Sequence, residues 1–208
     1  MVGRPVSFLS VALSGAAATC AGIGLARFAF VPLFPALVEA GWVSGAEAGL
    51  LGAAALAGYL PGVALAPRLA ARFGTRPVLH GAMAAIVASL LLCAIPGGLF
   101  WLLPWRLLAG LAGGALMSLA GPAVQRAVEP ERRGAASGIV IAGVGGGVAL
   151  GALVLPALLM GGPVLGWLGL AALAAALWGF AHRRFPEDAG APATGTPPAR
   201  RLLLAYAL

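Results

Sequence analysis

The sequence predicts an all-α fold, a polytopic transmembrane helix bundle with six spans, and three observations predict it. The 208-residue chain is 61% hydrophobic and only 9% charged, whereas a soluble domain usually carries about 25% charged residues. Its apolar residues form six stretches long enough to approach or exceed the roughly 20 residues that a helix needs to cross a bilayer. The arginines lie at the amino end and in every second gap between these stretches.

The arginine pattern predicts orientation as well as the number of crossings. All thirteen arginines except Arg27 and Arg106 lie at the amino end or in alternate gaps, and the other gaps contain none. Basic residues next to membrane spans stay on the cytoplasmic side. We therefore expect both ends to be cytoplasmic. Because Arg occurs without Lys, which fits a GC-rich bacterial genome, we expect a bacterial inner membrane.

The expected spans follow one another with short outer links and longer, basic inner links. The first span is interrupted by Arg27, Pro32 and Pro35. Two outer links, 96–98 and 161–163, are tight Pro/Gly turns, and the third, 39–47, carries two carboxylates and no base. The expected spans are 8–38, 47–66, 78–95, 99–124, 134–160 and 164–181.

Composition divides the chain into three parts. Residues 1–182 form the six-span bundle, and residues 183–201, polar and rich in Pro, Ala and Thr, form a flexible cytoplasmic linker. Residues 202–208 begin another apolar run, which as a helix would reach only about 10 Å. We expect this run to be the start of a truncated seventh span. The expected partner is a missing carboxyl-terminal half or a second copy of the chain.

Glycines recur at four-residue intervals within three of the spans. Small residues at this spacing let helix backbones approach closely, so we interpret them as helix-packing residues. Pro61 and Pro156, inside spans, also suit helices that bend. The glycines are Gly58 and Gly62 in the second span, Gly110 and Gly114 in the fourth, and Gly143, Gly147 and Gly151 in the fifth.

Arg27 and Arg106 lie inside apolar stretches, where a charge costs roughly 2.5–3.5 kcal/mol on insertion scales. One interpretation places both in a water-filled cavity, where they bind an anionic or polar substrate and Tyr59 and Trp105 line the same cavity. The other lets them reach outward to the interface, or pair with Glu39 or with carbonyls at helix ends. The sequence leaves both open.

Other classes of function lack their residues. Cys20 and Cys93 lie in apolar segments without His or Cys neighbours, so we expect no metal and no cofactor. The only Asp is in the linker, and His80 and His182 lie at the edges of different spans, so an enzyme is not expected. The net charge of +7 is spread over links, which indicates contact with the lipid bilayer and not with nucleic acid.

The link at 67–77 resembles the cytoplasmic signature of the major facilitator superfamily. That signature is an acid, Arg, any residue and Gly, followed by a nearby Arg or Lys. Arg72, Gly74 and Arg76 match this cytoplasmic loop motif, whereas Ala71 stands in place of the acid and Pro67 in place of the leading glycine. In the family the loop forms a charge-dependent latch, and the missing acid puts that latch in doubt.

Three further segments resemble the same superfamily. The fourth span is similar to its Arg-xxx-Gly motif, and the fifth to its glycine-and-proline motif. The run 22–28, followed by Pro32 and Pro35, is similar to the YbfB/YjiJ branch. The residues that carry these likenesses are Arg106, Gly110 and Gly114 in the fourth span, and Gly143, Gly147, Gly151 and Pro156 in the fifth.

The resemblance covers nearly the whole chain as the amino-terminal half of a twelve-span protein. It implies secondary-active transport of a small-molecule substrate by alternating access between two six-helix bundles. A six-span membrane scaffold or remnant that does not transport remains the alternative.

Overall fold

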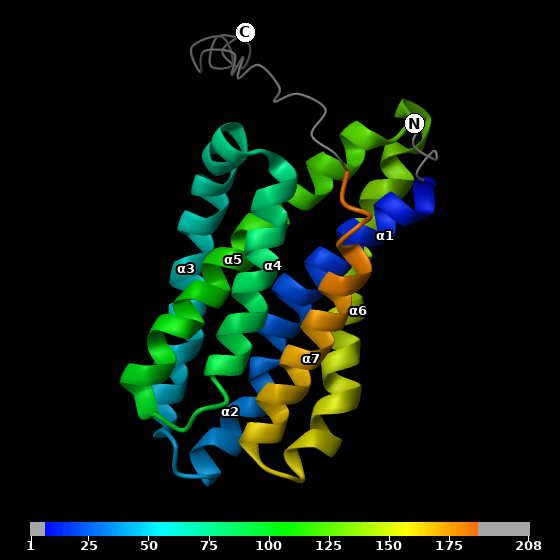
Figure 1. Cartoon of the computed structure of the whole chain (residues 1–208). Helices are drawn as coiled ribbons and strands as arrows, with labels where there is room; N and C mark the ends of the chain where they lie inside the picture. Colours follow the sequence, from blue (N-terminus) through cyan, green and yellow to red (C-terminus); the bar gives the residue numbers. More distant parts are fainter. Residues whose placement is uncertain (1–6, 187–208) are drawn as a thin grey trace, which may run out of the picture.

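The computed structural model describes residues 7–186, and all regular structure in those residues is helical (Figure 1). The all-α prediction is therefore confirmed. The expected seventh span at 202–208 and most of the expected linker lie outside the described residues. The elements are α1 (Phe8–Thr19), η1 (Cys20–Phe28), α2 (Phe30–Glu39), α3 (Gly45–Phe73), α4 (Thr75–Leu92), α5 (Gly98–Ala127), η2 (Pro130–Arg132), α6 (Arg133–Leu159) and α7 (Pro163–Ala181).

The described residues contain six helical stretches that are long and apolar enough to cross a membrane. The first, Phe8–Glu39, joins α1, η1 and α2, and the fifth, Pro130–Leu159, joins η2 and α6. The remaining spans are α3, α4, α5 and α7. The six-span prediction is confirmed.

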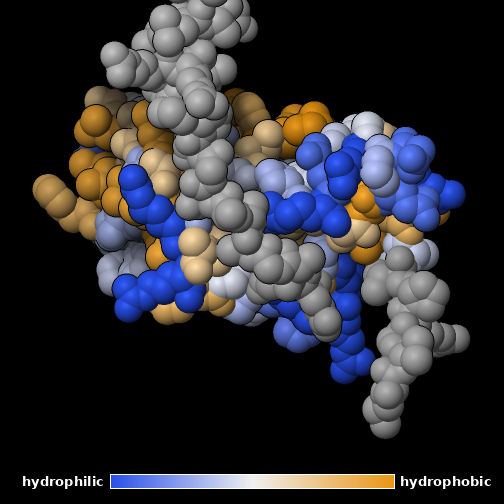
Figure 2. Space-filling model, turned by 90° about the horizontal axis from the view of Figure 1, so that it is seen from above, coloured by the Kyte–Doolittle hydropathy of each residue, from blue (hydrophilic) through white to orange (hydrophobic). Residues whose placement is uncertain are grey.

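The helices run side by side, and α5 contacts α1, η1, α3, α4 and α6. On the other side of the bundle α7 packs against α1, α4 and α6. The α3–α4 turn, the α5–α6 link and the end of α7 lie at the same end of the bundle (Figure 1). These segments contain the arginines of the links. Figure 2, which views this end from above, shows hydrophilic side chains on it. We call it the basic end.

Close backbone contact at glycine holds α3 against α5 and α6 against the first span. A Cβ added at Gly58 or Gly62 of α3 would overlap carbonyl groups of Leu107 or Leu111 in α5. The contact is reciprocal, since a Cβ on Gly110 or Gly114 of α5 would overlap the carbonyls of Ala55 or Tyr59. On the other side of the bundle Gly143 and Gly147 of α6 meet the carbonyls of Ala16 and Cys20. Backbone atoms cannot rotate away, so these crossings require glycine.

The expected inner link at 67–77 is mostly helix. Helix α3 continues through Pro67 and ends at Phe73, and α4 begins at Thr75. Gly74 alone makes the turn, with φ +93°, a conformation that suits glycine. A proline removes one helical hydrogen bond, yet α3 continues past Pro67 and packs along α5.

Packing continues beyond the last helix. Phe185 is buried, and the Ser14 hydroxyl donates to the Arg184 carbonyl at 3.2 Å. Residues 183–186, the beginning of the expected linker, therefore pack against α1 and α4.

Gly114→Ala tests the close crossing, with Gly121→Ala on the same helix as its matched control. A Cβ at Gly121 meets nothing within 4 Å, whereas at Gly114 it would overlap the Tyr59 backbone. We expect Gly114→Ala to destabilise the bundle by about 1–3 kcal/mol, the usual cost of overpacking, and Gly121→Ala to be neutral or stabilising. Thermal unfolding of both purified variants in the same detergent measures this. Equal melting temperatures would contradict the close crossing.

Candidate functional site

The middle of the first span is a π-helix, η1, over nine residues. Its hydrogen bonds reach five residues back, as in the Ala29 N–H donating to the Gly24 carbonyl at 3.2 Å. The wider turn fits because Gly22 faces Leu116 and Gly113, and Gly24 faces the Gly147 backbone. Such segments are rare and are often found at functional sites. This one contains Arg27.

Arg106 lies inside the bundle, with its side chain 1% exposed. Its Nη1 donates to the carbonyl oxygen of Ala26 at 2.8 Å, so α5 is bonded directly to the π-helix. Its guanidinium carbon lies 4.3 Å from the centroid of the Phe30 ring and 5.7 Å from that of Trp167. The sequence left open whether Arg106 faces a water-filled cavity or pairs with a carboxylate or a carbonyl. In the described residues its hydrogen-bond partner is the Ala26 carbonyl. The Nε atom has no hydrogen-bond partner among the described residues.

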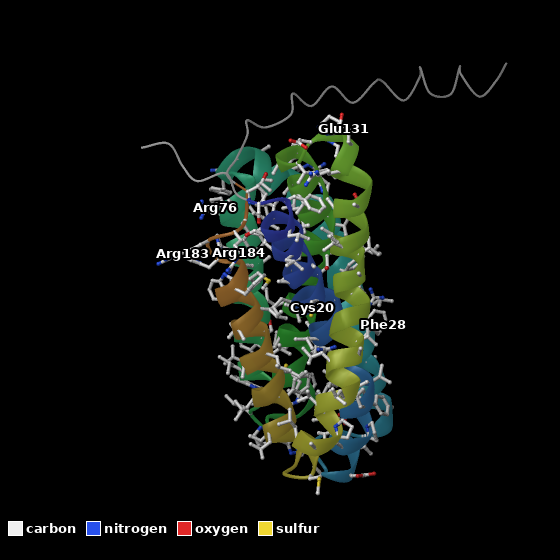
Figure 3. The ribbon with its side chains drawn as sticks, turned by 90° about the vertical axis from the view of Figure 1, so that its right-hand side faces the viewer. Cys20, Phe28, Arg76, Glu131, Arg183 and Arg184 are labelled. Carbon is white, nitrogen blue, oxygen red and sulfur yellow. The ribbon has the colours of Figure 1, made fainter. Side chains whose placement is uncertain are left out.

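Arg27 is only partly buried, and it lies on aromatic faces. Its guanidinium carbon is 5.2 Å from the Tyr59 ring centroid and 5.6 Å from that of Phe28. Phe28, its neighbour in the chain, lies part-way along the bundle and well away from the basic end (Figure 3). The structure thus brings Arg27 and Tyr59 together part-way along the bundle.

Trp105 has different surroundings. Its ring packs edge-on against Trp101 with centroids 5.8 Å apart, near the start of α5. Its Nε1 is buried without a partner among the described residues, like the Nε1 of Trp167. Trp105 therefore precedes Arg106 in the chain, but its ring contacts Trp101, which lies in the first turn of α5.

The loop-motif residues lie at the basic end. Arg72 is exposed and lies 5.2 Å from the centroid of the Phe73 ring. Gly74 forms the turn, and Arg76 Nη2 approaches the His182 carbonyl oxygen at 3.5 Å. Arg76 therefore connects the start of α4 with the end of α7.

A ring cluster strengthens this connection. The Trp178 Nε1–H donates to His80 Nδ1 at 3.0 Å. The His80 ring centroid lies 4.7 Å from that of His182 and 5.1 Å from that of Phe185. Sequence reasoning placed the two histidines at span edges on different helices, and it did not foresee their contact.

Carboxylates are confined to the helix ends in the described range. Glu39 is exposed at the end of α2, and Glu47 accepts a hydrogen bond from the Ser44 N–H at 2.7 Å, which caps α3. Glu129 pairs with Arg132 at 3.6 Å in the α5–α6 link, where Glu131 also lies. Within residues 7–186 no three His, Cys, Asp or Glu side chains lie close enough to hold a metal ion.

Sequence reasoning missed the π-helix and the aromatic pocket around Arg106. Phe30 and Trp167 stack with ring centroids 6.2 Å apart on helices that are distant in the chain. No sequence signal joins them. The glycines at 22 and 24 were the available hint of an unusual backbone.

Comparison with protein families decides the class. The family described as "Uncharacterised MFS-type transporter YbfB" matches residues 19–208. The chain belongs to this transporter family. It is accordingly a multi-pass membrane protein, as the six apolar helices also indicate. A comparison with curated proteins finds no significant match.

A solved structure shares the fold of this major facilitator chain. It is the crystal structure of a mutant of the peptide transporter POT in complex with sulfate, with a TM-score of 0.73 and 21% sequence identity. The match covers 99% of this chain and 44% of that one, so the chain spans less than half of its length.

Arg106→Met should lower stability, because it leaves the buried Ala26 carbonyl without its donor and removes the contact with the Phe30 ring. A hydrogen bond to a charged group is worth about 1.5–3 kcal/mol. Arg126→Met, an exposed position on the same helix, is the control, and Arg106→Lys should recover part of the loss. The measurement is the melting temperature in detergent. Unchanged melting of Arg106→Met would show that the contact does not stabilise the bundle.

Proposed function

We propose that the chain is the amino-terminal half of a secondary-active transporter that moves a small anionic or polar molecule by alternating access. The observation that carries the proposal is the position of Arg27 over Tyr59. A charge inside a membrane span costs roughly 2.5–3.5 kcal/mol, and Arg27 lies in the first span, only partly buried, on two aromatic rings. An ionisable residue within a membrane span is by default a candidate for a functional site, and binding a substrate is the role we propose for Arg27.

Arg27 and Arg106 differ in what they offer. Arg106 already donates to Ala26, one residue before Arg27, so it positions the segment that presents Arg27. Its Nε and the Nε1 of Trp105 remain donors without acceptors among the described residues. In the proposal Arg27 and Tyr59 meet the substrate first, and the spare donors of Arg106 and Trp105 bind an oxygen of the substrate when the bundle rearranges.

The proposed second half is supported by geometry and by length. In carriers built from repeats the substrate lies at the interface between two bundles. One bundle therefore supplies one wall of the path, and the solved POT structure has a chain more than twice as long as the matched region. The scaffold alternative explains neither the partly exposed Arg27 nor the family membership.

The proposed orientation places the basic end in the cytoplasm. Arg68 and Arg72 precede the α3–α4 turn, Arg132 lies in the α5–α6 link, Arg133 begins α6, and Arg183 follows α7. Basic residues flanking spans stay on the cytoplasmic side of a bacterial inner membrane. The proposed parts remain a bundle over 1–182, a linker over 183–201 and the start of a seventh span at 202–208.

Transport measurements on Arg27 variants test the function. Uptake and efflux of small anions are screened in vesicles from cells expressing the complete gene, with and without a proton gradient. For the anion that is moved, we expect Arg27→Gln to lower transport about 10- to 100-fold, the worth of one hydrogen bond to a charged group. Arg27→Lys should retain part of the transport activity, because the lysine ammonium keeps the positive charge but lacks the planar donor fork of the guanidinium.

Arg126→Gln, exposed at the basic end of α5, is the matched control and should transport normally at equal expression. Normal transport by Arg27→Gln would remove this arginine from the site. Absence of any transported solute across the screen would favour the scaffold.

The half-transporter proposal predicts that residues 1–208 do not transport alone as a monomer. Without a partner Arg27 would face lipid, at the cost given above. We expect residues 1–208, purified in mild detergent, to pair with a second copy or with a co-expressed carboxyl-terminal half, as mass measurement detects. A stable, monomeric and active species in liposomes would refute the proposal.

A further inference from the structure

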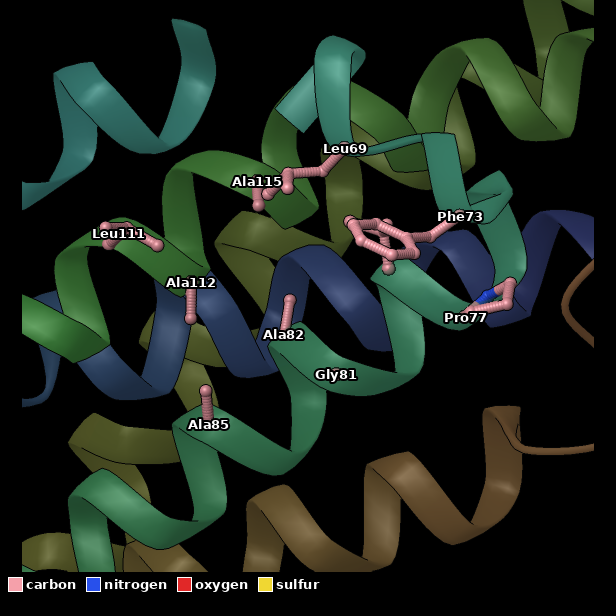
Figure 4. Close-up of a pocket in the computed structure, with 10 residues that line it drawn as sticks. Leu69, Phe73, Pro77, Gly81, Ala82, Ala85, Leu111, Ala112 and Ala115 are labelled. Carbon is pink, nitrogen blue, oxygen red and sulfur yellow. The ribbon is translucent and has the colours of Figure 1, made fainter. Parts of the chain in front are cut away.

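An apolar cavity of about 410 Å³ lies between α3, α4 and α5 on the side of the turn at Gly74 (Figure 4). Two of the side chains that line it, Leu69 and Phe73, are exposed to 38% and 57%, so the cavity opens to the surface of the bundle. Its lining residues include Leu69 and Phe73 of α3, Gly81 and Ala85 of α4, and Leu111 and Ala115 of α5.

The cavity results from how the three helices pack. Glycine crossings hold α3 tightly on α5, whereas α3 contacts α4 much less. The single-residue turn at Gly74 forces the two helices to start side by side, and α4 then presents small residues to the gap. A Cβ added at Gly81 meets nothing within 4 Å. No side chain of the described residues therefore fills this space.

The opening of the cavity carries positive charge. The Arg72 guanidinium carbon lies 5.2 Å from the centroid of the Phe73 ring, which lines the cavity. Arg68 is exposed one helical turn earlier on the same helix. The sequence has no acidic residue between Glu47 and Glu129, so neither arginine has a carboxylate nearby along the chain.

We propose that this cavity binds one acyl chain of an anionic phospholipid, whose phosphate contacts Arg72 and Arg68. The chain is a membrane protein, so the ligand is present at the opening, and an acyl chain matches a cavity that exposes almost no polar surface. Basic residues at the membrane surface attract anionic headgroups. The proposal needs only insertion in a bilayer and does not depend on the transport proposal.

The test is native mass spectrometry of the full chain in detergent, with added phosphatidylglycerol or phosphatidylcholine of identical acyl chains. We expect one phosphatidylglycerol to be retained in preference to phosphatidylcholine. Gly81→Leu and, as a second cavity-filling variant, Ala85→Leu should abolish retention. Arg72→Gln should lower the preference for phosphatidylglycerol about fivefold, the effect of one arginine near an anionic surface.

Two matched controls separate the site from general effects. Gly179→Leu places the same side chain at an exposed glycine of α7 with nothing within 4 Å, and Arg183→Gln removes a charge elsewhere at the basic end. Both should retain the lipid. Equal retention of the two lipids, or full retention by both cavity-filling variants, would overturn the proposal. So would a loss of dimer mass in Gly81→Leu without a change in bound lipid, since a second copy would then occupy the cavity.

Discussion

Close approach of helix backbones at glycine is the constraint on which the rest of this structure depends. In lipid there is little hydrophobic force between helices, so association relies on van der Waals contact and on hydrogen bonds. Here the α3–α5 and α1–α6 crossings are made by glycines that face carbonyl groups of the partner helix. Two other features follow from these crossings. The wide π-helix fits because Gly24 meets Gly147, and the apolar cavity opens because α3 is held on α5 and away from α4.

The π-helix and Arg106 depend on each other. A π-helix replaces the usual four-residue hydrogen bonds with five-residue ones, and such segments are rare and frequent at functional sites. Here the Ala26 carbonyl accepts from Arg106, whose guanidinium lies on the faces of Phe30 and Trp167. The buried charge therefore has a structural task that needs no carboxylate. Arg27, the next residue after Ala26, is the one left partly exposed.

The sequence predicted those features that depend on composition and order along the chain. Six spans and one basic end follow from apolar stretches separated by arginine-rich links, and a bilayer imposes that pattern directly. The end of α3 was predicted too early, because Pro67 resembles a helix end while tertiary contact carries the helix on to Phe73. The aromatic pocket of Arg106 and the contact of His80 with His182 join distant helices, and no local pattern encodes such contacts.

A shortage of carboxylates explains how the cations of this chain are held. Only six acidic residues accompany thirteen arginines, and those in the described range lie at helix ends. Aromatic faces take their place, as in the contacts of Arg27 with Tyr59 and of Arg184 with Phe180. A ring neutralises no charge, so an arginine on a ring still attracts an anion. At the basic end lipid phosphate is the abundant anion, and at Arg27 the substrate would be. The same use of rings in place of acids suits both proposed sites. In the loop motif Ala71 stands where the related signature has an acid, and Arg72 lies on the Phe73 ring.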